Sequence, residues 1–339
     1  MTIFAAMTRD EFYMQRCLQL AKNASGHTFP NPLVGSVVVW QDRIIGEGWH
    51  QKAGEPHAEV RALNAVKDKS LLSEAAVYVN LEPCSHYGKT PPCADLLVSS
   101  GIKRVVIGAL DSNAVVSGRG VEKLQKAGIL VTSGVLENEC RELNKRFYCF
   151  HERKRPWILL KWAQSADGFL SPEQKDEQAP VYLTGLLSRQ LVHRWRSEEH
   201  AILVGSQTAI DDNPKLDVRL WHGRNPVKIL IDRRKRVSEN HAIFKDGQTI
   251  VFSEPVDGDF MRFVMDELYR AGIQSVLVEG GRKTLTEFIQ SGFWDQARVF
   301  VSDVVLGNGT LAPVFNAVAG RETQVGGDKL LEYQNAAAR

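Results

Sequence analysis

The stretch "HAEVRALNAV" (residues 57–66) places a histidine and, two residues later, a carboxylate at the start of an apolar pattern that is typical of a helix. It comes directly after "AGEP" (53–56), a run that interrupts regular structure. Such a beginning has two interpretations. His57 and Glu59 either form a solvated helix start, or they are a metal ligand with a proton carrier beside it. The choice depends on residues further along the chain.

A second stretch, "LEPCSHYGKTPPCADLL" (81–97), supplies two thiols at junctions between expected elements. Cys84 follows an expected strand, and Cys93 begins an expected helix, whose N-terminus stabilises the thiolate that binds metal. Together with His57 they would give zinc three protein ligands and leave a fourth position for water, as in catalytic sites. Zinc lowers the pKa of such a water towards about 7, and Glu59 would carry its proton to a leaving amine.

Two other interpretations of these residues stay open. In the first, Cys84 and Cys93 are small buried thiols and His57 is a capping or core histidine. In the second, zinc is purely structural and takes a fourth ligand such as His86. The pattern H-x-E…P-C-x-x-C is typical of zinc nucleobase deaminases, but in this chain eight residues separate the cysteines.

Expected strands and helices alternate on both sides of these stretches. Thr8 and Glu11 have the spacing of a capping box, and two strand-like runs around Gln41-Asp42 predict a hairpin. The alternation that follows predicts a layered α/β domain whose later strands run parallel. The charged segment "FHERKRP" (150–156) marks the expected boundary, which gives domains over 1–148 and 149–339. The second half alternates again, with helices expected over 185–198, 259–271 and 284–291.

Composition narrows the classes of protein that fit. A chain of 339 residues suggests two domains, and 43% hydrophobic with 24% charged residues is typical of a soluble globular protein. The formal net charge of +2 predicts no preference for nucleic acid or membrane. No apolar run is long enough to span a bilayer, and no signal peptide is recognisable. Five scattered cysteines argue against a disulfide framework, so we expect a cytoplasmic protein.

Three stretches of the first half resemble a known family. "NPLVGSVVV" (31–39), "GEGWHQKAGEPHAEV" (46–60) and residues 81–97 are similar to the deaminase domain of the bifunctional deaminase/reductases of riboflavin biosynthesis. The long cysteine spacing is that family's own version of the motif. The resemblance implies a cytidine-deaminase-like three-layer α/β/α domain. It also implies that His57, Cys84 and Cys93 hold zinc, that Glu59 is the proton donor, and that Asn31 contacts the pyrimidine.

The second half taken alone carries weaker signals. In "SVLVEGGRKTLTEF" (275–288) a strand gives way to a helix at Gly280-Gly281, where backbone N–H groups can receive a pyrophosphate. A Gly-Gly pair after a strand is most often just a turn, and this one is not a Rossmann fingerprint. "VGSQTAIDDNP" (204–214) is a second junction between a strand and a polar loop.

"KWAQSADG" (161–168), "HAILVGSQTAIDDNPKLDVR" (200–219) and "VEGGRKT" (278–284) resemble the reductase half of the same family, which has a dihydrofolate-reductase-like fold and binds NADPH. The resemblance puts Arg196 and Arg219 on the substrate side, where they suit a 5-phosphate. Arg233 could neutralise a 2′-phosphate of the cofactor. The resemblance implies cofactor contacts from Ala163, Tyr182, Thr208, Asp212, Arg233, Gly281, Arg282, Lys283 and Thr284, and substrate contacts from Arg196, Leu216, Arg219 and Glu279.

The sequence therefore predicts a bifunctional enzyme. Zinc-dependent hydrolytic deamination of 2,5-diamino-6-(5-phosphoribosylamino)pyrimidin-4(3H)-one would precede NADPH-dependent reduction of its ribosyl group to ribityl. One alternative is a deaminase whose reductase domain has diverged, and another is a deaminase that binds and edits nucleic acid. The near-neutral charge favours a small phosphorylated pyrimidine over nucleic acid or membrane as partner. The resemblance also suggests a homodimer formed through the reductase domains.

Overall fold

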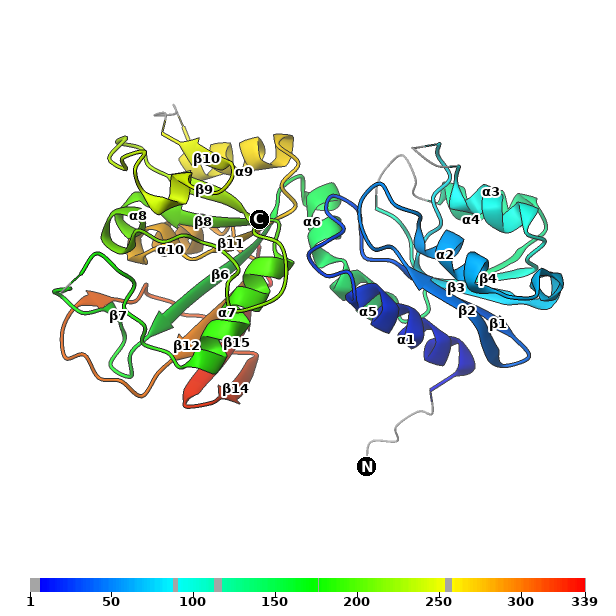
Figure 1. Cartoon of the computed structure of the whole chain (residues 1–339), viewed down its shortest axis with the longest axis horizontal. Coiled ribbons are helices and arrows are strands. Elements are labelled where there is room, and N and C mark those ends of the chain that lie inside the picture. The colour runs from blue at the N-terminus through cyan, green and yellow to red at the C-terminus, as the bar shows by residue number, and fades with distance from the viewer. Residues whose placement is uncertain (1–6, 88–90, 113–117, 176, 254–257, 339) are drawn as a thin grey trace. The chain divides into compact units, whose positions relative to one another are not determined.

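The structure is a computed structural model that describes residues 7–87, 91–112, 118–175, 177–253 and 258–338. It divides after Glu152 into two compact units (Figure 1). The boundary expected between 148 and 149 falls inside helix α6 (Lys145–Arg153). The charged segment continues a helix there because Phe147, Tyr148 and Cys149 bury their side chains. Within the described ranges no helix combines the length and the apolar character needed to cross a bilayer.

The first unit is built on one five-stranded sheet with the order β2-β1-β3-β4-β5. The expected hairpin β1–β2 is confirmed, and Gln41 and Asp42 at its turn both have positive φ, as a two-residue type I′ turn requires. The expected parallel pairing is also confirmed, because β3, β4 and β5 run parallel to one another. The strands are β1 (Gly35–Trp40), β2 (Arg43–Trp49), β3 (Ala76–Leu81), β4 (Arg104–Ala109) and β5 (Leu130–Ser133).

Helices cover both faces of this sheet, because successive residues of its inner strands alternate between two apolar clusters. In β3, for example, Val77 and Val79 face one cluster, whereas Tyr78 faces the other. One cluster is covered by α2 (Ala58–Ala65), α3 (Cys93–Ser99) and α4 (Arg119–Lys126), with the 3-10 helix η1 (Lys69–Glu74), and the other by α1 (Arg9–Lys22) and α5 (Glu137–Leu143). The capping box of α1 is confirmed, with Thr8 and Glu11 each accepting the other's backbone N–H.

The second unit contains an eight-stranded sheet with the order β10-β9-β8-β11-β6-β12-β15-β14, of which the first six strands are parallel. The last two strands pair antiparallel, and a separate pair joins β7 to β13. The strands are β6 (Trp157–Gln164), β7 (Phe169–Ser171), β8 (Ala201–Gly205), β9 (Val227–Ile231), β10 (Thr249–Phe252), β11 (Ser275–Val278), β12 (Gln296–Val301), β13 (Thr310–Leu311), β14 (Arg321–Val325) and β15 (Asp328–Gln334).

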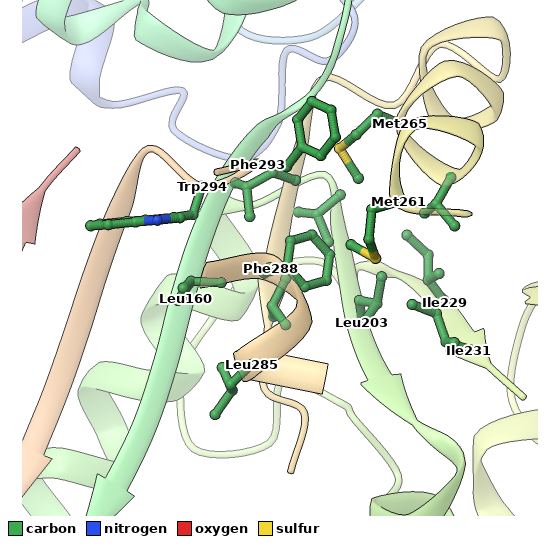
Figure 2. Packing of buried hydrophobic residues seen from close by; sticks show 14 of the residues in the cluster. Leu160, Leu203, Ile229, Ile231, Met261, Met265, Leu285, Phe288, Phe293 and Trp294 are labelled. Atoms are coloured by element: carbon green, nitrogen blue, oxygen red, sulfur yellow. The ribbon is translucent and has the colours of Figure 1, made fainter. Parts of the chain in front are cut away.

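This sheet also has a helix layer on each face. Helices α9 (Phe260–Arg270) and α10 (Arg282–Ser291) bury Met261, Met265 and Phe288 against β6, β8 and β9 (Figure 2). Helices α7 (Leu186–Glu198) and α8 (Ser206–Asp212) lie on the other face, where Trp195 stacks on Phe300. A 3-10 helix, η2 (Ala242–Phe244), completes the described elements of this unit.

The strand order reverses between the neighbouring parallel strands β8 and β11. From β8 the chain passes through α8 to β9 on one side, and from β11 through α10 to β12 on the other. Because α8 and α10 lie on opposite faces, a crevice opens beyond the carboxyl ends of these two strands. This is the place where open α/β sheets bind their ligands.

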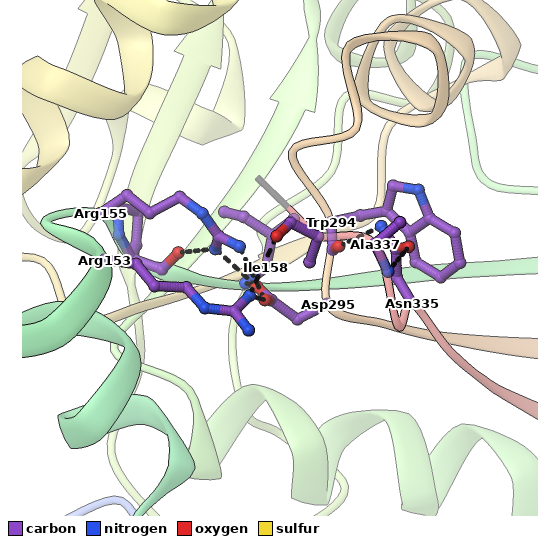
Figure 3. Close-up of polar contacts among 9 residues, drawn as sticks. Arg153, Arg155, Ile158, Trp294, Asp295, Asn335 and Ala337 are labelled. Atoms are coloured by element: carbon purple, nitrogen blue, oxygen red, sulfur yellow. Dashed lines mark hydrogen bonds and ion pairs between the residues drawn. The ribbon is translucent and has the colours of Figure 1, made fainter.

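A buried ion pair fastens the first strand of this unit to its C-terminal part. Arg155 and Asp295 are 1% and 3% exposed, and the guanidinium contacts both carboxylate oxygens at 2.7 and 2.8 Å (Figure 3). The backbone N–H of Ile158 donates to the same carboxylate at 2.8 Å, and Arg153 adds a second guanidinium at 3.1 Å. The backbone of Asn335 hydrogen-bonds the Asp295 carbonyl. Asp295 therefore ties together the entry and the exit of the sheet, through its carboxylate and its backbone carbonyl.

We expect Asp295→Asn to lower the free energy of unfolding of the second unit by about 3–5 kcal/mol, because it leaves a buried guanidinium without its counter-charge. Urea unfolding followed by tryptophan fluorescence measures the loss. Asp303→Asn, a matched change at an exposed aspartate, should stay within about 0.5 kcal/mol of the wild type. Equal stability of the two variants would show that the buried pair contributes nothing.

Candidate metal centre and candidate cofactor cavity

Three side chains of the first unit converge at the carboxyl end of β3. Nδ1 of His57 lies 3.5 Å from Sγ of Cys84 and 3.3 Å from Sγ of Cys93, and all three ligand atoms lie within 4.8 Å of one another. A tetrahedral zinc ion with bonds of about 2.0–2.3 Å holds its ligand atoms roughly 3.5–3.8 Å apart. The donor set and its spacing therefore fit zinc.

The surrounding elements explain why these side chains meet. His57 is the residue before α2, but its side chain makes no capping hydrogen bond, so it is not a helix cap. Cys93 is the first residue of α3, and its backbone N–H donates to Sγ of Cys84 at 3.3 Å. His86 is exposed and, among the described residues, does not belong to the group that could hold a metal. The stretch 85–92 is only partly visible, because residues 88–90 lie outside the described ranges.

The pKa values of the two thiols shift in opposite directions. A hydrogen bond from Cys93 lowers the pKa of Cys84 to about 4 against the effect of burial, and His57 adds to the lowering. The hydrogen bond to the Cys84 sulfur, followed by burial, raises the pKa of Cys93. Two adjacent sulfurs therefore share one proton as long as no cation compensates a second negative charge. A divalent cation would allow both to act as thiolates.

Glu59 lies on the first turn of α2 and is 3% exposed. Burial, followed by the nearby Cys84 sulfur, raises the pKa of its carboxyl to about 7. The carboxyl is therefore close to half protonated near neutral pH and can both accept and release a proton. It is outside the ligand group formed by His57, Cys84 and Cys93.

Asn31 contacts a histidine that sequence reasoning missed. Its Nδ2 lies 3.0 Å from Nε2 of His50, whose Nδ1 lies 3.3 Å from the carbonyl oxygen of Pro56. The His50 and His57 rings are perpendicular, with centroids 5.4 Å apart. If Nδ1 donates to Pro56, Nε2 accepts from the Asn31 amide, and the Asn31 carbonyl is left to accept from a substrate. A histidine that ends a strand, seven residues before His57, was the available signal.

Glu82 is a second residue that the sequence did not single out. Among the described residues, its buried carboxylate accepts the backbone N–H groups of Asp111, Gly118, Gly120 and Val121. A Cβ at position 120 would lie 2.2 Å from the carbonyl oxygen of Pro83, so only glycine allows this approach. Glu82 therefore fastens the end of the β4–α4 connection against the residues that lead into Cys84.

The second unit contains a cavity of about 1450 Å³ at the crevice between β8 and β11. All the residues that the resemblance assigned to this half line it. Those expected to contact the cofactor are Ala163, Tyr182, Thr208, Asp212, Arg233, Gly281, Arg282, Lys283 and Thr284, and those expected to contact the substrate are Arg196, Leu216, Arg219 and Glu279. A cavity of this volume has room for a dinucleotide together with a second ligand.

Glycines allow close approaches at the ends of β8 and β11, in the lining of the cavity. A Cβ at Gly205 would lie 2.3 Å from Oγ1 of Thr284, and the N–H of Gly281 donates to Oγ1 of Thr208 at 2.9 Å. Gly281 precedes α10 and has no side chain to cap it, so the first N–H groups of this helix are available to an anion. Arg233 lies over the Phe260 ring at 3.7 Å.

A buried cluster of charges also lines the cavity. The Arg196 guanidinium contacts both carboxylate oxygens of Glu279 at 2.8 and 2.9 Å, and Nζ of Lys161 lies 3.8 Å from the same carboxylate. Burial opposes ionisation of Glu279, but Arg196 and Lys161 outweigh it and lower its pKa to about 2. Lys161 was missed, although a lysine inside the apolar run "WILLKWA" was the signal for it. Arg219 donates to the Tyr182 hydroxyl at 3.1 Å and pairs with Asp217.

Comparisons with known proteins agree with the expectations for both halves of the chain. Residues 7–109 match the family model of the cytidine and deoxycytidylate deaminase zinc-binding region, and residues 156–325 match the RibD C-terminal domain. The riboflavin biosynthesis protein RibD of Aquifex aeolicus is 41% identical over 88% of each chain. The RibD of Escherichia coli is 36% identical over 88% of this chain and 89% of its own.

Solved structures give the same result over nearly the whole length. The deaminase/reductase of Thermotoga maritima has a TM-score of 0.88 at 37% identity and covers 97% of this chain and 99% of its own. Acinetobacter baumannii RibD has a TM-score of 0.86 at 32% identity, with the same coverage. The expected fold, a cytidine-deaminase-like domain followed by a reductase domain, is confirmed.

The two expected activities and their cofactors are confirmed with it: the protein is a zinc-dependent deaminase and an NADPH-dependent reductase. No finding supports a diverged reductase half or an editing deaminase. The chain belongs to the RibD family of bifunctional deaminase/reductases of riboflavin biosynthesis.

Proposed function

We propose that the two sites act in turn on one phosphorylated pyrimidine, 2,5-diamino-6-(5-phosphoribosylamino)pyrimidin-4(3H)-one, with the residue roles given below. The observation that carries the proposal is the group of three ligand atoms within 4.8 Å of one another, with a buried carboxyl beside it. This arrangement suits hydrolytic removal of an amino group, which needs an activated water and a proton carrier.

In the first unit His57, Cys84 and Cys93 would hold the metal. Zinc supplies a Lewis acid that makes a water nucleophilic at neutral pH. Glu59 takes a proton from the attacking water and delivers it to the amino group, which then leaves as ammonia. Burial raises the pKa of its carboxyl, so that it can hold the proton between the two transfers. The Asn31 amide, oriented by His50 at 3.0 Å, would accept a hydrogen bond from the pyrimidine.

In the second unit the N-terminus of α10, from Gly281 to Thr284, would receive the pyrophosphate of the cofactor. NADPH supplies the hydride. Thr208 and Asp212, together with Ala163 and Tyr182, would position the nicotinamide half, and Arg233 would meet the 2′-phosphate. On the other side of the cavity Arg219 would bind the substrate phosphate. Arg196 and Glu279, already paired, would set the electrostatics around the ribose, with Leu216 as an apolar wall.

Glu59→Gln should reduce ammonia release by at least about a thousandfold, because glutamine cannot carry the proton while the three ligands remain. Bound zinc, measured by atomic emission, should stay at one per chain, and NADPH oxidation with the deaminated substrate should be unchanged. Glu139→Gln, a matched change at an exposed glutamate of α5, should keep both activities. A Glu59→Gln protein that deaminates at a tenth of the normal rate or faster would contradict the role.

Arg219→Ala should raise the KM for the deaminated substrate about ten- to a hundredfold, since a charge-assisted contact to phosphate is lost. Steady-state NADPH oxidation should show little change in kcat, because the phosphate is bound equally in the ground and transition states. Arg270→Ala, on the exposed side of α9, is the control and should leave the KM unaltered. A fall in kcat at constant KM would instead place Arg219 in the hydride-transfer step.

We also propose that the protein is a cytoplasmic homodimer joined through its second units. Support for the dimer comes from large apolar side chains that are exposed between residues 304 and 318, among them Val305, Val314 and Val318. All five cysteines are free thiols, which supports a reducing compartment. Light scattering after gel filtration should give twice the 37.9 kDa of one chain. The mass of a single chain at micromolar concentration would contradict the dimer.

A further inference from the structure

His193 is a buried histidine of α7 that the proposed chemistry leaves without a role. It is 4% exposed, and it lines the substrate side of the cavity. Its Nδ1 accepts a hydrogen bond from the backbone N–H of Arg219 at 3.2 Å. An accepting Nδ1 carries no proton, so the proton of the neutral ring is on Nε2.

The segment that carries Arg219 has no regular secondary structure of its own between residues 213 and 219. Three side chains hold three successive backbone groups of it. Arg196 donates to the Asp217 carbonyl at 3.0 Å, Asn225 accepts the Val218 N–H at 2.8 Å, and His193 accepts the Arg219 N–H. Arg196 and His193 belong to the same helix and lie one turn apart. Two of the three contacts that hold the segment therefore come from α7.

The surroundings keep the imidazole able to accept. Burial, followed by the positive charges of Arg196 and Arg219, lowers the pKa of His193 to about 4, although Glu279 and Asp217 oppose this. At neutral pH the ring is uncharged. A protonated ring would present an N–H to the Arg219 N–H and break the contact.

We propose that His193 is a positioning residue for substrate recognition: its imidazole fixes the Arg219 backbone so that the guanidinium meets the phosphate of the substrate. The inference rests on the proposed phosphate-binding role of Arg219. It deepens that role by naming what holds the arginine in place. If the segment were not fixed, the entropy lost in ordering it on binding would weaken the affinity of Arg219 for the phosphate.

Two replacements separate the accepting atom from the rest of the ring. In His193→Asn the amide oxygen stands close to the position of Nδ1 and can accept the same N–H, whereas His193→Phe keeps an aromatic ring and removes the acceptor. We expect His193→Phe to raise the KM for the deaminated substrate about five- to tenfold, as for one lost hydrogen bond. Its kcat, its KM for NADPH and its rate of ammonia release should stay within about twofold of the wild type, and His193→Asn should restore the KM.

A double-mutant cycle tests whether His193 acts through Arg219. If it does, His193→Phe should raise the KM further by less than about twofold in an Arg219→Ala background. Inorganic phosphate, used as a competitive inhibitor, should bind more weakly to His193→Phe and to Arg219→Ala, and the double variant should bind it no more weakly than Arg219→Ala. These readouts follow the phosphate contact and do not respond to a general loss of stability.

Independent, multiplying effects of the two changes would overturn the inference, as would a His193→Asn protein no better than His193→Phe. A raised KM for NADPH in His193→Phe would also overturn it, because the damage would then extend to the whole cavity. A wild-type KM in Arg219→Ala has a different meaning: the proposed role of Arg219 itself would fail. Absence of NADPH oxidation by the wild-type protein would refute the assignment of the activity.

Discussion

The chemistry of the first unit depends on the electrostatic constraint that one imidazole and two thiols impose on one another. Their ligand atoms lie within 4.8 Å, and the two sulfurs cannot both be deprotonated without a compensating charge, because the Cys84 sulfur raises the pKa of Cys93. The fold brings these groups together, because His57 precedes one helix and Cys93 begins another at the carboxyl end of the same sheet. A cation relieves this constraint, and the same buried environment gives Glu59 a pKa suited to moving protons.

The second unit has the same layered α/β architecture but forms its site in a different way. Its site lies where the strand order reverses, so that helices leaving β8 and β11 go to opposite faces and open a crevice. Glycines allow the backbones to approach there: a side chain at Gly205 or Gly280 would collide with Thr284. In the lining of the same cavity, Arg196 and Lys161 hold Glu279 ionised in a buried position. The cavity thus offers both backbone dipoles and fixed charges to its ligands.

Much of this organisation could be predicted from the sequence, because the spacing of apolar residues follows the positions that are buried in each helix or strand. The capping box at Thr8, the hairpin at Gln41-Asp42 and the parallel order after β3 all depend on local patterns. Other elements were not predictable in this way. The residues 206–212 were read as a polar loop but form α8, and the final hairpin β14–β15 has strands with one largely exposed face. The charged segment 150–156 was expected to mark the domain boundary, but its first four residues continue α6, whose buried residues Phe147, Tyr148 and Cys149 precede them.

The residues that the sequence could not reveal share a physical reason. Glu82 accepts the N–H groups of the β4–α4 connection, and His193 accepts the N–H of Arg219. Every residue except proline offers a backbone N–H, so the partner leaves no mark in the sequence, and the acceptor looks like any buried polar side chain. Both acceptors come from regular elements or their ends and hold irregular segments next to a site. One of these segments carries Arg219, for which we propose a contact to the substrate phosphate. The positions of both segments come from single side chains anchored in the elements beside them.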